Sequence, residues 1–176
     1  PNGGFLQLSG PELPRLAVDQ FDYPTQAPNF SYGLNGNASV REFRFFAKPT
    51  PSQPNGISTL TNAVADLHFS VPRGFFAYPF SLSIASAQPG TLIRYTTNGS
   101  IPTLTNGITY TQPIAINASR VIRAAGFASN QLPSRVQTHS YLYNLPNSRR
   151  LLPVVSLVTA TNNLYGRTGI MEFNPR

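Results

Sequence analysis

The side chains that could perform acid–base chemistry are few in this chain and lie far apart along it. Its 176 residues include six carboxylates, and these are Glu12, Asp19, Asp22, Glu42, Asp66 and Glu172. Glycoside hydrolysis by its usual route needs two carboxylates about 5–10 Å apart, one of them protonated. Between residues 66 and 143 the only carboxylate is Asp66. One carboxylate cannot fill both roles, so we expect no catalytic residue in this part of the chain.

The two histidines, His68 and His139, both lie in segments with the alternating pattern of strands. His68 lies two residues after Asp66, so both side chains are expected on the same face of the strand. This pair could bind a metal or act as a pH switch. The simpler alternative is that both side chains face solvent. A metal site or catalytic triad needs further Asp, Glu, Cys or His partners, and the sequence contains no cysteine. For His139, alternation with Tyr141 fits either a core face or a surface face. We therefore expect no metal and no cofactor.

The charge and hydropathy patterns argue against two classes of partner. The formal net charge is +7, but the basic residues are scattered and only Arg149 and Arg150 are adjacent. Nucleic-acid-binding domains usually gather Lys and Arg on one face, so we expect no nucleic-acid partner. Binding to another acidic polymer remains an alternative. The longest apolar run, "LLPVVSLV", has eight residues and contains Pro153, whereas a membrane span needs about 20.

The periodicity predicts an all-β protein, since no window of 11 residues keeps a helical apolar pattern free of Pro or Gly. Turn signals recur between residues 66 and 143 at the spacing of an antiparallel sandwich of short strands. The strands predicted there are "DLHFS", "FSLSIAS", "TLIRYTT", "GITYT", "PIAI", "VIRAAGFA" and "VQTHSYLY". Alternation points Ile93 and Tyr95 into the core. The small residues beside Ile122 predict that another strand or sheet approaches closely.

Outside this sandwich the chain separates into three further stretches. Residues 1–47 contain two predicted strands, "RLAVDQFDYP" and "VREFRFFAKP". Residues 48–65 are rich in Pro, Ser, Thr and Asn, which predicts a linker. Residues 144–176 open with a predicted buried strand over 154–158 and then become rich in turn residues.

The segment "IRYTTNGSIPT" predicts a strand followed by a turn. Asn and Gly suit a chain reversal, and Pro102 prevents the strand ladder from continuing. The residues assigned to this structural turn are Asn98, Gly99, Ser100, Pro102 and Thr103.

The same stretch resembles a known family. "PFSLSIASAQPGTLIRYTTNGSIPT", with "YTQPIAI", "VIRAAGFASN" and "PSRVQTHSYL", is similar to the chitobiase/β-hexosaminidase C-terminal-like domain, a glycoside-hydrolase-associated sandwich. That family usually has Tyr-Thr-Thr-Asp-Gly-Ser-x-Pro-Thr at the hairpin, and here Asn98 replaces the Asp. Because Asn carries no charge, a cation-binding role at this position is weakened. The resemblance implies an immunoglobulin-like or fibronectin-type-III-like antiparallel β-sandwich over residues 66–143.

The flanks carry shorter resemblances. "NFSYGLNGN" and "FRFFAKPTPSQPNG" resemble the end of a lamin-tail-like domain, placed at residues 1–47. "LPVVSLVTATNNLYGRTGIM" resembles the start of a CotH kinase-like domain, placed at residues 144–176. This order implies an extracellular or cell-surface bacterial protein with many domains, so any targeting signal is expected outside the present chain.

For function, the resemblances imply a non-catalytic accessory or spacer module whose partners are neighbouring domains of the same polypeptide, and polysaccharide. The alternative is a substrate-positioning part of a CotH-like kinase or glycoside hydrolase whose catalytic residues lie outside this chain. Sugars stack on exposed rings, but Trp, a frequent platform, is absent. The candidate glycan-stacking residues are Tyr78, Tyr110, Tyr141 and Tyr143.

Overall fold

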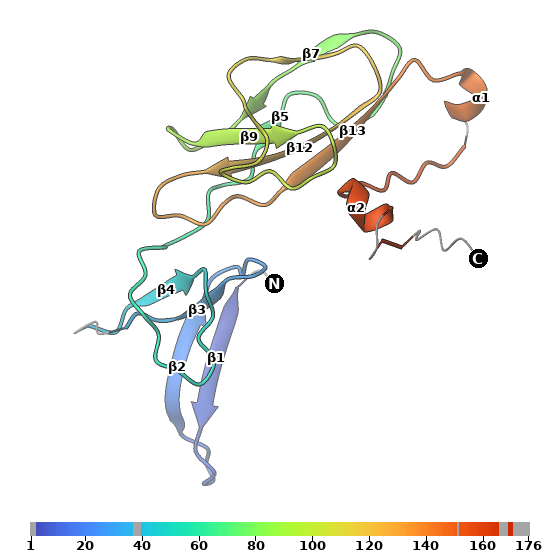
Figure 1. Cartoon of the computed structure of the whole chain (residues 1–176). Helices are drawn as coiled ribbons and strands as arrows, with labels where there is room; N and C mark the ends of the chain where they lie inside the picture. The colour runs from blue at the N-terminus through green and yellow to red at the C-terminus, as the bar shows by residue number, and fades with distance from the viewer. Residues whose placement is uncertain (1–2, 37–39, 151, 166–168, 171–176) are drawn as a thin grey trace, which may run out of the picture. The chain divides into compact units, whose positions relative to one another are not determined.

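The computed structural model describes residues 3–36, 40–150, 152–165 and 169–170 (Figure 1). The chain divides into two compact units, which we describe one at a time. The first unit comprises residues 1–62 with 130–132, and the second comprises residues 63–129 with 133–176. Among the described residues, no helix is long and apolar enough to span a membrane.

The described residues of the first unit form two antiparallel strand pairs. Strand β1 (Gly4–Ser9) pairs with β2 (Ala17–Tyr23), and β3 (Ser31–Leu34) pairs with β4 (Phe43–Phe46). The sequence indicated β2 and β4, whereas β1 and β3 were not predicted. Strand β3 contains Gly33 within a run of turn-forming residues, so its conformation depends on pairing with β4 rather than on local propensity.

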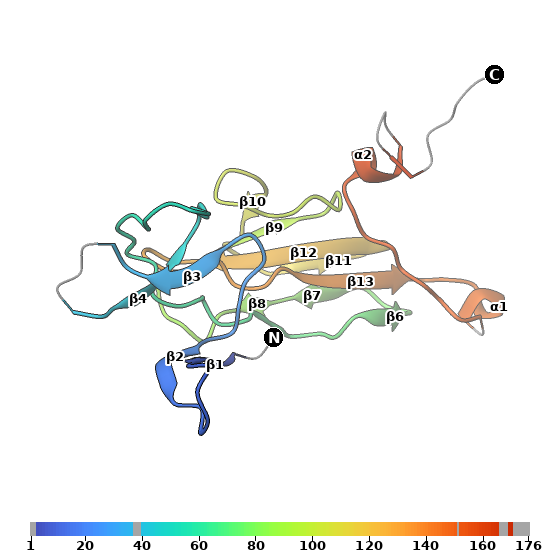
Figure 2. The same cartoon turned by 90° about the horizontal axis from the view of Figure 1, so that it is seen from below.

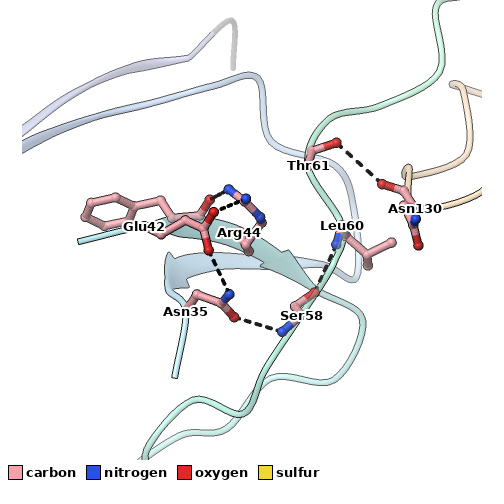
Figure 3. Close-up of polar contacts among 8 residues, drawn as sticks. Asn35, Glu42, Arg44, Ser58, Leu60, Thr61 and Asn130 are labelled. Atoms are coloured by element: carbon pink, nitrogen blue, oxygen red, sulfur yellow. Dashed lines mark hydrogen bonds and ion pairs between the residues drawn. The ribbon is translucent and has the colours of Figure 1, made fainter. Parts of the chain in front are cut away.

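Residues 56–61 differ from the expected linker because they run back along β4 (Figure 3). The Phe45 N–H donates to the Leu60 carbonyl oxygen at 3.0 Å, and the Ser58 hydroxyl donates to the Phe45 carbonyl oxygen. At the far end of this segment, the backbone N–H of Thr61 donates to the carbonyl oxygen of Asn130 at 3.2 Å. Pairing with β4 satisfies backbone groups that a free linker would leave to water.

Asn35 joins this segment to Glu42, the residue before β4, through both ends of its side-chain amide (Figure 3). Its Oδ1 accepts the N–H of Ser58 at 2.8 Å, and its Nδ2 donates to Glu42 Oε2 at 3.1 Å. The Glu42 carboxylate also pairs with Arg44. Asn35 itself is buried, whereas the Glu42 side chain is 40% exposed, so water competes for the Glu42 end of this network more than for Asn35.

We therefore expect Asn35→Ala to destabilise the first unit by about 1–3 kcal/mol, because it removes two hydrogen bonds of about 0.5–1.5 kcal/mol each. Urea denaturation followed by far-UV circular dichroism would measure this change. Gln53→Ala is the control, since Gln53 is an exposed amide in the turn after β4 and does not have a positive φ. Equal stability of the two variants would show that the amide does not hold the segment to Glu42.

The second unit is a β-sandwich. Its described residues form the strands β5 (His68–Phe69), β6 (Gly74–Phe76), β7 (Phe80–Leu82), β8 (Ile84–Ala85), β9 (Leu92–Thr96), β10 (Ile108–Thr109), β11 (Ile114–Ile116), β12 (Arg120–Phe127) and β13 (Gln137–Tyr143). One sheet has the order β10-β9-β12-β13-β6, and the pairs β11–β7 and β5–β8 complete the fold. Figure 2 shows β9, β12 and β13 side by side. The predicted all-β, antiparallel class is confirmed.

Strand β6 was not predicted, and it pairs in parallel with β13. It is three residues long and begins at a glycine, so it carries no alternating pattern that local analysis could detect. Its position depends on the register with β13, in which Gly74 lies opposite Tyr141.

Side chains from the strands and from Leu67, just before β5, converge on one apolar core. Its buried members are Leu67, Phe69, Leu82, Ile84, Ile93, Ile114, Ile116, Ile122, Ala124 and Tyr141. The predictions that Ile93 and Tyr95 face inward are confirmed, since Ile93 is a member and Tyr95 packs against the cluster. The predicted close approach on the Ile122 face occurs at Gly126, where a β-carbon would lie 2.8 Å from Thr91 Cγ2.

Beyond β13 the residues that the structure describes include the short helices α1 (Asn147–Arg150) and α2 (Thr161–Leu164). The buried strand predicted over residues 154–158 is absent: these residues have no strand structure, and Val155 and Leu157 are exposed. A strand needs a partner's backbone, whereas here the recorded contact of this segment is the side chain of Ser156 with that of Ser140.

Candidate functional site

The turn after β9 is held by side chains that bond to nearby backbone groups. Asn98 Oδ1 accepts the backbone N–H of Ser100 at 3.1 Å and its hydroxyl at 2.7 Å. The Thr96 hydroxyl donates to the Ser100 carbonyl oxygen at 2.6 Å. Gly99, at the tip, has a φ of 79°, in the left-handed region that favours glycine. We call residues 98–100 the Gly99 tip.

The chain after the Gly99 tip forms a second polar turn that ends at Gly107. The Thr103 hydroxyl accepts the backbone N–H groups of Asn106 at 3.0 Å and Thr105 at 3.3 Å. The Asn106 side chain donates to the carbonyl oxygen of Ile101 at 2.7 Å, and Pro102 is buried. All five residues assigned to the structural turn therefore lie within one hydrogen-bonded loop, residues 98–107.

Two arginines that sequence reasoning missed hold both ends of this loop. Arg123 of β12 donates from Nη1 to the Gly99 carbonyl oxygen at 2.7 Å, and Arg94 of β9 donates to the Gly107 carbonyl oxygen. Both arginines alternate along their strands with core residues, so both side chains lie on the outer face of the five-stranded sheet. The alternation of each arginine with core residues could have shown from the sequence that its side chain faces outward. It could not identify the carbonyl groups that the arginines bind.

Asp66 forms an ion pair with Arg135 and not with His68, the histidine two residues away. Arg135 Nε donates to Asp66 Oδ2 at 2.9 Å and to Oδ1 at 3.2 Å. This carboxylate holds the pKa of Arg135 above its usual value. His68 is exposed on β5, opposite Ala85. In the described part of the chain, no group of three or more His, Asp or Glu side chains is placed to hold a metal ion.

The four candidate glycan-stacking tyrosines lie in different environments. Tyr141 is fully buried, and its hydroxyl donates to the Val71 carbonyl oxygen at 2.9 Å; the same burial raises the pKa of Tyr141. Contrary to the expectation, Tyr141 presents no ring to a ligand. Tyr110 packs against the core and accepts the N–H of Ile84 at 3.1 Å, and Tyr143 is half-buried. Tyr78 is 81% exposed.

His139 faces the core, which resolves the two alternatives left by the sequence. Its ring stacks on Phe69 with 4.1 Å between centroids, and its Nδ1 lies 3.2 Å from the Tyr141 hydroxyl oxygen. Burial lowers the pKa of His139 from its ordinary value, and the nearby positive charge of Arg73 lowers it further.

We expect this lowered pKa to make the sandwich less stable in acid. The unfolded chain takes up a proton at His139 near pH 6.5, whereas the folded chain resists it, so protons favour the unfolded state. Stability should fall as the pH drops through about 6.5 and level off below the folded-state pKa. Urea denaturation between pH 7.5 and 5 would measure this fall. His139→Gln should flatten the dependence, whereas His68→Gln at the exposed histidine should not. The same slope in the wild type and both variants would contradict the assignment.

The geometry and topology together define the second unit as an antiparallel sandwich of the immunoglobulin-like or fibronectin-type-III-like kind. Residues 82–141, about a third of the chain, match the family model described as Fn3 associated. The matched segment contains every member of the buried core cluster except Leu67 and Phe69. No curated protein matches the chain, and no solved structure does.

Proposed function

We propose that the sandwich is a non-catalytic accessory module that holds neighbouring parts of the same polypeptide in place. The observation that carries this proposal is the coincidence of the Fn3 associated match with the closed apolar core. A well-packed core gives a module one rigid conformation, which is the property that a positioning element requires.

Two features of the polar residues support a structural role for them. Arg94 and Arg123, on the outer face of the sheet, donate hydrogen bonds to carbonyl oxygens of the 98–107 loop. Their guanidinium groups therefore stabilise the fold. Asp66 forms a two-pronged ion pair with Arg135, so both of its carboxylate oxygens already have a partner within the fold. These contacts explain the site residues without a reaction.

The wider setting that we propose is a large exported or cell-surface bacterial protein. The support is the resemblance of residues 1–47 to a lamin-tail-like end and of residues 144–176 to a CotH-like start. In that setting the partners of the sandwich are domains of its own polypeptide. If the polypeptide also carries an enzyme, the sandwich contributes to substrate positioning and not to the chemical step.

Turnover assays test the non-catalytic proposal directly. The chain should release no product from chromogenic glycosides and no phosphate from ATP above a buffer blank. Turnover that disappears in an Asp66→Asn variant, while an Asp22→Asn control retains it, would overturn the proposal. Thermal denaturation of both variants would show whether lost activity reflects lost folding.

A second candidate function, weak carbohydrate binding, is favoured by one surface feature. Tyr78 is 81% exposed, and Phe75 of the neighbouring strand β6 is also exposed. Rings left open to solvent in this way suit the apolar face of a sugar. An NMR titration with soluble polysaccharides should shift resonances near Tyr78, and Tyr78→Ala should abolish the shifts. Leu104→Ala, which truncates another exposed apolar side chain, is the control. Identical titrations for both variants would reject this site.

A further inference from the structure

At the Gly99 tip, the backbone of Gly99 is in close contact with the backbone of a later segment of the chain. A β-carbon built on Gly99 would lie 2.3 Å from the carbonyl oxygen of Thr159 and 3.1 Å from its carbonyl carbon. No side chain fits at such distances, so the backbone of Thr159 passes directly over Gly99. The glycine therefore serves a second purpose besides its positive φ.

A second contact lies three residues earlier in the same segment. The hydroxyl oxygens of Ser156 and Ser140 are 2.6 Å apart. Ser140 lies opposite Val121 on β12, on the same outer face as Arg123. In Figures 1 and 2 the chain turns back toward the sheet after α1, before it reaches α2. The segment thus meets the sheet at β13 and again at the Gly99 tip.

The spacing of the two contacts fits an extended segment that crosses the sheet. Three extended residues span about 10 Å. The tip follows β9, which is separated from β13 by β12 alone, and two strand spacings also amount to about 10 Å. Ser156 and Thr159 can therefore reach their partners together without strain.

Both sides of the Thr159 contact are also held by hydrogen bonds of their own. Arg123 fixes the Gly99 carbonyl group from the β12 side, and Asn98 fixes the turn through Ser100. On the other side, Asn163 of α2 donates from Nδ2 to the Thr159 hydroxyl oxygen at 2.7 Å. Two preorganised elements lose little conformational freedom when they dock.

We propose that the Gly99 tip, together with Ser140, is a docking site for residues 156–160 of the same chain. Docking at these two points fixes the direction in which the polypeptide leaves the sandwich on its way to α2. This inference rests on the proposed positioning function and deepens it, because it names the surface that does the positioning.

Substitutions at two glycines with similar backbone conformations distinguish an effect on docking from an effect on the turn. Gly90 has a φ of 75° and no neighbouring atom within 4 Å of a β-carbon built on it, whereas Gly99 has a φ of 79° with Thr159 in that place. Asn tolerates the left-handed conformation better than other side chains. Gly99→Asn therefore keeps the turn and blocks docking, and Gly90→Asn imposes the same backbone cost without touching the segment.

Limited thermolysin digestion provides the readout, because bonds near Val155 and Leu157 are cleaved faster when the segment detaches. Gly99→Asn should raise the cleavage rate between residues 154 and 159 by about tenfold, and Gly90→Asn should leave it at the wild-type rate. Ser140→Ala and Ser156→Ala provide a second test that leaves the tip intact. Each should raise the rate by a smaller factor, and the double variant should equal either single variant, since both remove one contact.

Equal cleavage rates for the wild type, Gly99→Asn and Gly90→Asn would overturn the docking proposal. Additive effects of the two serine variants would exclude their shared contact. Neither result bears on the turnover assays, which test the proposed function separately. Conversely, turnover by the intact chain would end the non-catalytic proposal and leave the docking result standing.

Discussion

Tyr141→Ala is expected to lower the free energy of unfolding of the sandwich by about 3–5 kcal/mol, the range found for truncation of large buried aromatic side chains. Tyr141 is fully buried in the core cluster, with the rings of Phe76 and Phe80 at centroid distances of 5.8 and 5.6 Å. Truncation removes those contacts and leaves a cavity between β13 and the opposite layer. Urea denaturation followed by tyrosine fluorescence would measure the loss.

Two control variants divide this effect into its parts. Tyr141→Phe keeps the ring and removes only the hydroxyl that donates to the Val71 carbonyl oxygen, so it should cost about 1 kcal/mol. Tyr78→Ala removes an exposed ring and should stay within about 0.5 kcal/mol of the wild type. A Tyr141→Ala variant as stable as Tyr78→Ala would contradict the burial of Tyr141 in the core.

Ile122→Ala should cost about 2–5 kcal/mol, because it truncates a side chain with no exposed surface in the strand at the centre of the five-stranded sheet. Strands on both sides of β12 limit how far the site can collapse around the cavity. Ile108→Ala is the matched control, since Ile108 is an exposed isoleucine on the edge strand β10. Urea denaturation should show that the free energies of unfolding of the two variants differ by at least about 1.5 kcal/mol, and thermal denaturation should give the same order of stability. A smaller difference would place Ile122 outside the core.

The sandwich was predictable because its strands alternate and its turns are punctuated by Gly, Pro and Asn. The segment around Ile93 shows why, since one apolar side chain in every two identifies the buried face without knowledge of partners. The face of β13 could not be assigned in this way. His139, Tyr141 and Tyr143 are all amphipathic, so their pattern is the same whether the ring lies in the core or in solvent.

Other features depend on contacts between distant residues and left no local pattern. Strand β6 exists through its parallel register with β13, and residues 56–61 bond to Asn35 and to Phe45 of β4. The outward position of Arg123 was visible in the sequence, but the Gly99 carbonyl group that it binds was not. Likewise, Gly99 was predicted to lie in a turn, while its contact with Thr159 is apparent only in the folded chain.

The positioning role of the sandwich can be tested by one distance measurement. The sequence has no cysteine, so Ser83→Cys and Asn162→Cys provide unique sites for two nitroxide labels, one on the sandwich and one in α2. Pulsed electron paramagnetic resonance should give a narrow distance distribution in this background. The distribution should broaden when Gly99→Asn is added and stay narrow when Gly90→Asn is added. A broad distribution without either glycine substitution would contradict the account, because the sandwich would then not fix the chain that follows it.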